Sequence, residues 1–309
     1  MNDFTVQPQP AANRPVAVIT GGNTGLGFET AKALSRHGYH VVLACRDTQK
    51  GGAAAKRLVA ADQGGDIQVA SLDLASDDSV KRFSHHFLKR HTRLDRLINN
   101  AGIMAVPYAL TETGYELQYG VNHLGHFLLT HQLMPALQQS PGARVVTVTS
   151  LAARMAKPRQ LLSPARRYDK WNAYSISKMA NLMFGLELHD RMRRHGLSVK
   201  SVLAHPGFSR THLQNALLQS HKQTERLTGK ALLALCQPAA QGALPIIHAA
   251  LSDTVRSGDF YGPSGFLQIK GLPKKVQLPS SAYNPSLRST FWTLSERQTR
   301  TSYADIWKK

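Results

Sequence analysis

Short apolar runs alternate with amphipathic segments along the first two thirds of the chain. Residues 16–19 and 40–45 are rich in β-branched side chains, and each run has the length of a buried strand. Residues 28–34, between them, have the spacing of a helix. Further strands are expected to end just before Asp73 and near residues 99, 150 and 204. This alternation predicts an α/β fold with a doubly wound parallel sheet.

The length of 309 residues suits one domain with a large core. No internal repeat or low-complexity linker marks a second domain, so a flexible tail (1–13) and a single domain (14–309) are expected. The first residues contain neither the features of a signal peptide nor an apolar run that could span a bilayer. Two cysteines, Cys45 and Cys236, cannot form a disulfide framework, and the cytoplasm is the expected compartment.

A glycine-rich turn joins the first strand to the first helix, Thr20-Gly21-Gly22-Asn23-Thr24-Gly25-Leu26-Gly27. Glycines let a backbone approach its ligand, and a helix N-terminus offers free N–H groups, so the turn predicts a pyrophosphate cradle. Its spacing differs from G-x-G-x-x-G, and an ordinary turn is the alternative. Arg46 follows the second strand, 19 residues after Gly27. An arginine there suits the 2′-phosphate of NADP, whereas an acid would favour NAD.

Tyr174 and Lys178 are four residues apart in a helical segment and therefore share one helix face. A phenol keeps its proton to about pH 10, and a nearby ammonium lowers that pKa until the tyrosine becomes a usable acid or base. On its own, such a pair is more often part of a solvated helix surface. The catalytic interpretation therefore depends on the other motifs of the chain.

Those motifs occur in a fixed order: Asp73-Leu74, Asn99-Asn100-Ala101-Gly102, Asn122, Ser150 at the end of the fifth strand, and His205-Pro206-Gly207 with Thr211 after the sixth. Together with the glycine turn and the Tyr-Lys pair, they resemble the classical short-chain dehydrogenase/reductase family over about residues 14–270. Within it, segments 43–47, 122–127 and 177–181, and the long insert between Ser150 and Tyr174, are most similar to the retinol-dehydrogenase-like branch. The resemblance implies a Rossmann-type fold in three αβα layers.

The resemblance also implies a role for each motif. Tyr174 would exchange a proton with the substrate oxygen, and Lys178 would hold the nicotinamide ribose and lower the pKa of the phenol. Ser150 would bond the substrate oxygen, and Asn122 would hold a water. A substrate lid is expected at about residues 208–240. The implied cofactor-binding residues are Gly21, Asn23, Thr24, Gly25, Leu26, Gly27, Arg46, Asp73, Leu74, Asn100, Ala101, Gly102, Tyr174, Lys178, Pro206, Gly207 and Thr211.

We therefore expect an oxidoreductase that prefers NADP(H) over NAD(H) and acts on a carbonyl or alcohol, such as an apolar aldehyde or ketone. One alternative is a non-enzymatic NADP-binding regulator or interaction protein. Another is a nucleotide-sugar epimerase or dehydratase, which the glycine spacing and the lack of a large C-terminal substrate domain oppose. The identity of the substrate, the direction of the reaction and a homodimer are left open.

The chain is strongly basic, with 38 Lys and Arg against 19 Asp and Glu, a formal net charge of +19. Such an excess suggests a nucleic acid or an anionic membrane, but the basic residues are dispersed without interleaved aromatics, and no nucleic-acid partner is expected. The 14 histidines form no zinc motif, so no metal is expected. The densest basic cluster is either solvated surface or an attractor for acidic substrates or partners: Arg154, Lys157, Arg159, Arg166, Arg167 and Lys170.

Overall fold

One eight-stranded sheet organises the part of the chain that the computed structural model describes, residues 14–61, 66–162, 167–209 and 236–307. Its order is β3-β2-β1-β4-β5-β6-β7-β8, and all strands are parallel except the edge strand β8. This confirms the predicted doubly wound sheet. The expected tail, most of the expected lid and Thr211 lie outside the described residues. The strands are β1 (Val16–Thr20), β2 (His40–Cys45), β3 (Ile67–Ser71), β4 (Arg96–Asn99), β5 (Arg144–Val148), β6 (Lys200–Ala204), β7 (Phe260–Pro263) and β8 (Pro273–Lys275).

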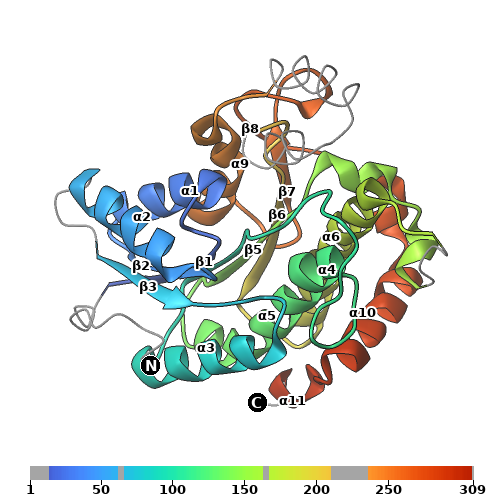
Figure 1. Cartoon of the computed structure of the whole chain (residues 1–309), viewed down its shortest axis with the longest axis horizontal. Helices are drawn as coiled ribbons and strands as arrows, with labels where there is room; N and C mark the ends of the chain where they lie inside the picture. The colour runs from blue at the N-terminus through green and yellow to red at the C-terminus, as the bar shows by residue number, and fades with distance from the viewer. Residues whose placement is uncertain (1–13, 62–65, 163–166, 210–235, 308–309) are drawn as a thin grey trace.

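Helices cover both faces of the sheet and make the three expected layers (Figure 1). One face packs against α1 (Gly25–Arg36), α2 (Thr48–Ala61) and α9 (Ala239–Leu251). The other face packs against α3 (Asp77–Arg90), α5 (Gly125–Gln138) and α6 (Lys170–Arg194). The remaining elements are α4 (Leu117–Tyr119), η1 (Gly120–Leu124), η2 (Leu151–Met155), η3 (Pro158–Leu161), η4 (Phe266–Gln268), η5 (Ser280–Tyr283), α10 (Pro285–Thr299) and α11 (Ala304–Trp307).

The apolar runs form strands because both faces of the sheet are covered. Every residue of β1 and β2 is buried, which is why these strands are continuously apolar rather than alternating. Helix α3 shows the usual end signals: the Ser76 hydroxyl accepts from the Ser79 N–H, and acidic residues occupy the first turn and basic residues the last. Local pattern and tertiary burial therefore agree over the first half of the chain.

Two C-terminal elements complete the described fold. The segment after Asp259 contains β7, which extends the parallel sheet. Position 262 of this strand has no room for a side chain, because a Cβ there would lie 2.0 Å from Nε2 of the buried His205. Helix α10 runs from Pro285 to Thr299 and buries Phe291 and Trp292.

Within the described residues, no helix is both long and apolar enough to cross a bilayer. The expected compartment stays a prediction.

Candidate active site

The glycine turn between β1 and α1 has the geometry of a phosphate cradle. Gly21 and Gly25 have left-handed backbones, with φ of 63° and 55°. A Cβ on Gly27 would lie 2.4 Å from the Gly21 carbonyl oxygen, so only glycine fits there. Thr24, the N-cap of α1, makes no side-chain bond to the helix, and the first turn has no acidic residue. The N–H groups of that turn and their positive dipole therefore suit an anion.

A cavity of about 690 Å³ extends from this turn across the carboxyl ends of the neighbouring strands. Lys50, which the sequence analysis missed, also lines it, one helical turn after Asp47. Asp47 caps α2 by accepting from the Lys50 N–H at 2.9 Å. The groove brings together twelve of the expected cofactor residues: Gly21, Asn23, Thr24, Gly25, Leu26, Gly27, Arg46, Asp73, Leu74, Asn100, Ala101 and Gly102.

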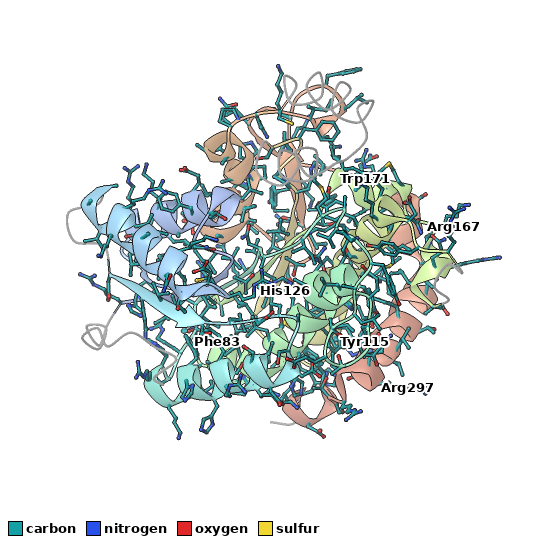
Figure 2. All side chains as sticks on the ribbon, in the orientation of Figure 1. Phe83, Tyr115, His126, Arg167, Trp171 and Arg297 are labelled. Carbon is teal, nitrogen blue, oxygen red and sulfur yellow. The ribbon has the colours of Figure 1, made fainter. Side chains whose placement is uncertain are left out.

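A buried hydrogen-bond network fixes the floor of the groove. The Thr20 hydroxyl accepts from the backbone N–H groups of Asn100 and Ala101, each at 2.9 Å. It also lies 2.8 Å from Nε2 of His126, whose Nδ1 is 2.9 Å from the Asn122 carbonyl oxygen. Because a carbonyl only accepts, Nδ1 carries the proton and Nε2 accepts from Thr20. Burial lowers the pKa of His126 to about 4, which keeps the ring neutral at the centre of the molecule (Figure 2).

Asn122 lies in η1, a π-helical turn of the kind found often at functional sites. Its Nδ2 donates to the Ile103 carbonyl and to the Ser177 hydroxyl, both at 2.9 Å, and its Oδ1 accepts from the Ile103 N–H at 2.8 Å. A Cβ on Gly102 would lie 3.2 Å from both Asn122 Oδ1 and Lys178 Nζ. The side chain thus holds the chain after β4 beside Lys178, and the water-holding role implied by the resemblance stays a prediction.

Ser150, Tyr174 and Lys178 meet where β5 ends against α6. The fifth strand ends at Val148, two residues earlier than expected, and Ser150 caps η2 by accepting from the Ala152 N–H at 3.2 Å. Lys178 Nζ donates to the Val148 carbonyl at 3.3 Å and lies 5.9 Å from the centre of the Tyr174 ring. Tyr174 is 9% exposed and Lys178 is 4% exposed. Both ionisable groups are therefore almost completely shielded from water.

Burial changes the acidity of this pair. It raises the pKa of Tyr174 to about 12, against the lowering effect of a hydrogen bond with Ser150. It lowers the pKa of Lys178 to about 8. The spacing of the pair predicted a lowered phenol pKa, and for the protein alone that prediction was wrong, because the loss of hydration disfavours the phenolate. At neutral pH Tyr174 keeps its proton and can act as an acid.

An apolar cavity of about 400 Å³ opens beside Ser150 and Tyr174. A small cavity lined by Asn100, Gly102, Tyr174, Lys178 and Pro206 lies next to it, and Leu26 lines both cavities as well as the groove. The sequence analysis missed most of the pocket wall, since apolar residues carry no motif. The other residues that line the pocket are Met104, Leu151, Ala152, Met155, Trp171, Ser175, Pro206, Gly207, Phe208 and Ser209.

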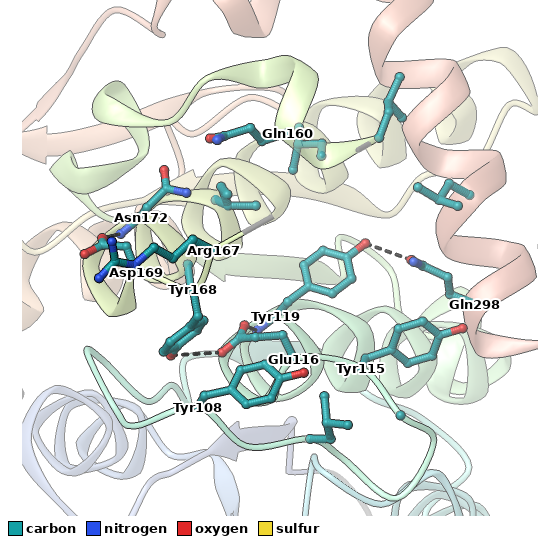
Figure 3. A pocket seen from close by; sticks show the side chains of 17 residues that line it. Tyr108, Tyr115, Glu116, Tyr119, Gln160, Arg167, Tyr168, Asp169, Asn172 and Gln298 are labelled. Atoms are coloured by element: carbon teal, nitrogen blue, oxygen red, sulfur yellow. Dashed lines mark hydrogen bonds between the residues drawn. The ribbon is translucent and has the colours of Figure 1, made fainter. Parts of the chain in front are cut away.

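A separate cavity, of about 510 Å³, lies on another face of α6 (Figure 3). Asn172 and Ile176 line it, whereas Tyr174 lines the pocket described above. Four tyrosines contribute to its wall: Tyr108, Tyr115, Tyr119 and Tyr168. The nearby Glu116 carboxylate is already bonded to two backbone N–H groups at the start of α4. The N-terminal part of α6 therefore separates two cavities, of which one contains the expected catalytic residues.

Comparison with known proteins agrees with this geometry. The family model described as short chain dehydrogenase matches residues 15–222. The chain therefore belongs to the short-chain dehydrogenase family, and it is an oxidoreductase that acts on alcohol or carbonyl groups. It is similar to retinol dehydrogenase 12 of Homo sapiens, with 39% identity over 283 residues, 91% of this chain and 84% of that protein. It is also similar to human retinol dehydrogenase 14, with 36% identity over 90% of this chain and 84% of that protein.

Solved structures show the same fold. The crystal structure of an uncharacterized protein from Mycobacterium paratuberculosis matches with a TM-score of 0.76 and 38% identity, over 94% of this chain and 97% of that chain. The Pseudomonas aeruginosa RhlG/NADP complex matches with a TM-score of 0.63 over 82% of this chain and 94% of that chain. At 23% identity, the second match shows the fold alone. The predicted family and its retinol-dehydrogenase-like branch are thus confirmed.

Proposed function

We propose that the protein transfers hydride between NADP(H), used in preference to NAD(H), and a carbonyl or alcohol carbon of a lipophilic small molecule. One observation carries this proposal. The cavity lined by Tyr174 and Lys178 lies between a groove with a phosphate cradle and an apolar pocket lined by Ser150. Such an arrangement allows cofactor and substrate to meet beside Tyr174 and Lys178.

In the direction of reduction, NADPH held by the glycine turn and Arg46 would supply the hydride for the carbonyl carbon. Tyr174, protonated at neutral pH because of its burial, donates its proton to the carbonyl oxygen. The Ser150 hydroxyl donates a hydrogen bond to the same oxygen and stabilises the charge that develops there. Lys178, held by the Val148 carbonyl, supplies a buried positive charge beside the phenol. The apolar wall excludes water from the transferred hydride.

The preference for NADP(H) rests on two cations at one end of the groove. Arg46 and Lys50 both line it, and a guanidinium suits a phosphate because it can donate two parallel hydrogen bonds. Asp47 is the acid that could instead bond a ribose 2′-hydroxyl. Its carboxylate is engaged by the Lys50 N–H and, at 3.1 Å, by the Lys50 ammonium. This pairing favours the phosphate over the hydroxyl.

Titration with NADPH and NADH, followed by nicotinamide fluorescence, tests the cofactor site. Arg46→Asp should weaken NADPH binding by about 10- to 100-fold, because a charge-assisted phosphate contact becomes a repulsion, and should leave NADH binding unchanged or stronger. Arg36→Asp, an equal charge change at the end of α1, is the matched control and should have little effect. Equal affinity of the native protein for both nucleotides would contradict the NADP preference.

A series of linear aldehydes of increasing length tests the substrate class. Burial of each methylene in the apolar pocket should raise kcat/KM by about threefold to fourfold until the pocket is full. Tyr174→Phe is the control that removes the proton donor and leaves the pocket apolar. If NADPH binds tightly and no carbonyl or alcohol is turned over, the enzymatic proposal fails and a nucleotide-binding regulator becomes the better interpretation.

A further inference from the structure

Four large apolar side chains are exposed to solvent on the wall of the apolar pocket and on the loop that contacts this wall. Met155 lines the pocket and is 69% exposed. Phe266, Leu267 and Leu272, in the loop between β7 and β8, are 85%, 64% and 70% exposed. Single exposed apolar residues are ordinary, but a group at one site marks an interaction surface. We call these four residues the apolar rim.

The loop between β7 and β8 is fastened to the pocket wall. The Phe208 N–H donates to the Ile269 carbonyl at 2.9 Å. Gly207 permits this approach, since a Cβ there would lie 2.2 Å from the same carbonyl oxygen. On the other side, Arg154 Nη2 donates to Gln268 Oε1 at 3.1 Å and joins the loop to η2, which carries Met155. The members of the apolar rim are therefore held on two adjoining segments.

The backbone conformation of the loop also contributes to the exposure of its apolar side chains. Leu267 and Gln268 have left-handed backbones, with φ of 51° and 59°, which is unfavourable for residues other than glycine. Gln268 Oε1 accepts a second bond, from His205 Nε2 at 3.0 Å. His205 has its proton on Nε2, because its Nδ1 accepts from the Gly207 N–H. The strained backbone turns Leu267 outward while Gln268 is tied to the buried interior.

The described segments that carry the apolar rim are basic and contain no acidic residue. The sequence has no Asp or Glu between Glu116 and Asp169, and none between Asp259 and Glu296. These two stretches supply η2, η3, the loop and β8. Their exposed cations near the apolar rim are Arg154, Lys157, Arg159, Lys270 and Lys274. A partner that combines an apolar interior with an anionic surface matches both features.

We propose that the apolar rim docks the protein on the surface of an anionic lipid bilayer, with the apolar pocket opening toward the lipid. Aliphatic and aromatic side chains enter the boundary between headgroups and acyl chains, and the surrounding cations contact the headgroups. This end of the molecule carries β8 at the top of Figure 1, away from α3 and α11. The proposal adds an interaction surface to the proposed activity, and lipid binding can be measured without turnover.

Co-sedimentation of the full chain with vesicles tests the docking. Binding is expected to vesicles that contain phosphatidylserine and to be much weaker with phosphatidylcholine alone. Phe266→Ser with Leu267→Ser should lower the partition coefficient by about tenfold for each side chain. Lys270→Glu with Lys274→Glu should lower it by at least about fivefold for each charge. The matched controls, on α2 and α3, are Val59→Ser with Leu88→Ser and Lys81→Glu with Lys89→Glu.

The substituted side chains are exposed, so thermal melting should show that each variant is folded. A Phe266→Trp probe gives an independent measurement: its emission should shift to the blue with phosphatidylserine vesicles, against the background of the three native tryptophans. Equal losses in rim and control variants would mean general attraction by the net positive charge and would overturn the proposal. Absence of binding to phosphatidylserine vesicles would also overturn it. The same holds if the rim variants weaken binding to a DNA duplex and leave vesicle binding unchanged.

Discussion

Four buried histidines should make the folded state sensitive to mild acid. His91, His123, His126 and His205 are each at most 5% exposed. Burial lowers the pKa of His123 to about 3 and that of the other three to about 4. A histidine in the unfolded chain has a pKa of about 6.5. Because the folded pKa values are lower, the stability that these residues contribute is complete above about pH 6.5 and is lost as the pH falls toward 4.

The size of the effect follows from these pKa differences. At about pH 5, protonation in the unfolded state costs the fold about 2 kcal/mol for each histidine, or about 8 kcal/mol for the four. The whole free energy of unfolding of a domain is about 5–15 kcal/mol. We therefore expect the protein to lose most of its stability between about pH 6.5 and 5, before its carboxylates are fully protonated.

Urea unfolding at a series of pH values measures this loss directly. Each histidine contributes a slope of up to about 1.4 kcal/mol per pH unit. His123→Phe should remove one such contribution, since the new ring takes the place of a ring packed 5.0 Å from Phe291 and 5.3 Å from Tyr119. His37→Gln, a substitution at an exposed histidine, is the control variant. A native slope near zero, or the same slope in His123→Phe, would refute the reasoning.

Four further predictions concern the site and the core. Tyr174→Phe should lower kcat by about 10²- to 10⁴-fold and leave the NADPH Kd unchanged; a small loss in steady-state rate would exclude Tyr174 as the acid. Because the pKa of Tyr174 is raised to about 12, alcohol oxidation should accelerate as the pH rises from 7 to 10, and carbonyl reduction should not. Gly27→Ala should abolish nucleotide binding in a fluorescence titration, since its Cβ would meet the Gly21 carbonyl. Trp292→Ala should cost about 3–5 kcal/mol in urea unfolding, because its ring is buried against Phe127 and Tyr303.

Residues whose type is restricted by chemistry or by space could be found from the sequence. Gly27 has no room for a side chain, and Asn100 donates its amide to the Thr20 carbonyl at 2.8 Å to tie the ends of β1 and β4 together. Such positions tolerate one residue type, which is why they form a motif. The strands of the first half were found for a related reason, since burial on both faces leaves a continuous apolar run.

Residues whose role depends on long-range packing could not be found in the same way. β7 contains Gly262 and Pro263, which read locally as a turn, and it is a strand because β6 and β8 pair with it. Met104 and Trp171 come from segments far apart in the sequence and meet only at the apolar pocket. His126 had no local signal either, because its two bonding partners lie on η1 and at the end of β1.

Tyr174 combines one property that the sequence predicts with another that only the packing of the chain determines. Its distance from Lys178 along α6 is a local property, and on that basis a lowered phenol pKa was expected. Its burial depends on how α6 packs against η2 and the end of β5, and this collective property raises the pKa instead. The consequence is chemical: a buried phenol that keeps its proton is ready to protonate a carbonyl oxygen, whereas oxidation of an alcohol first requires the proton to leave. At neutral pH the packing of α6 therefore leaves Tyr174 in the protonated form that the proposed reduction of a carbonyl requires.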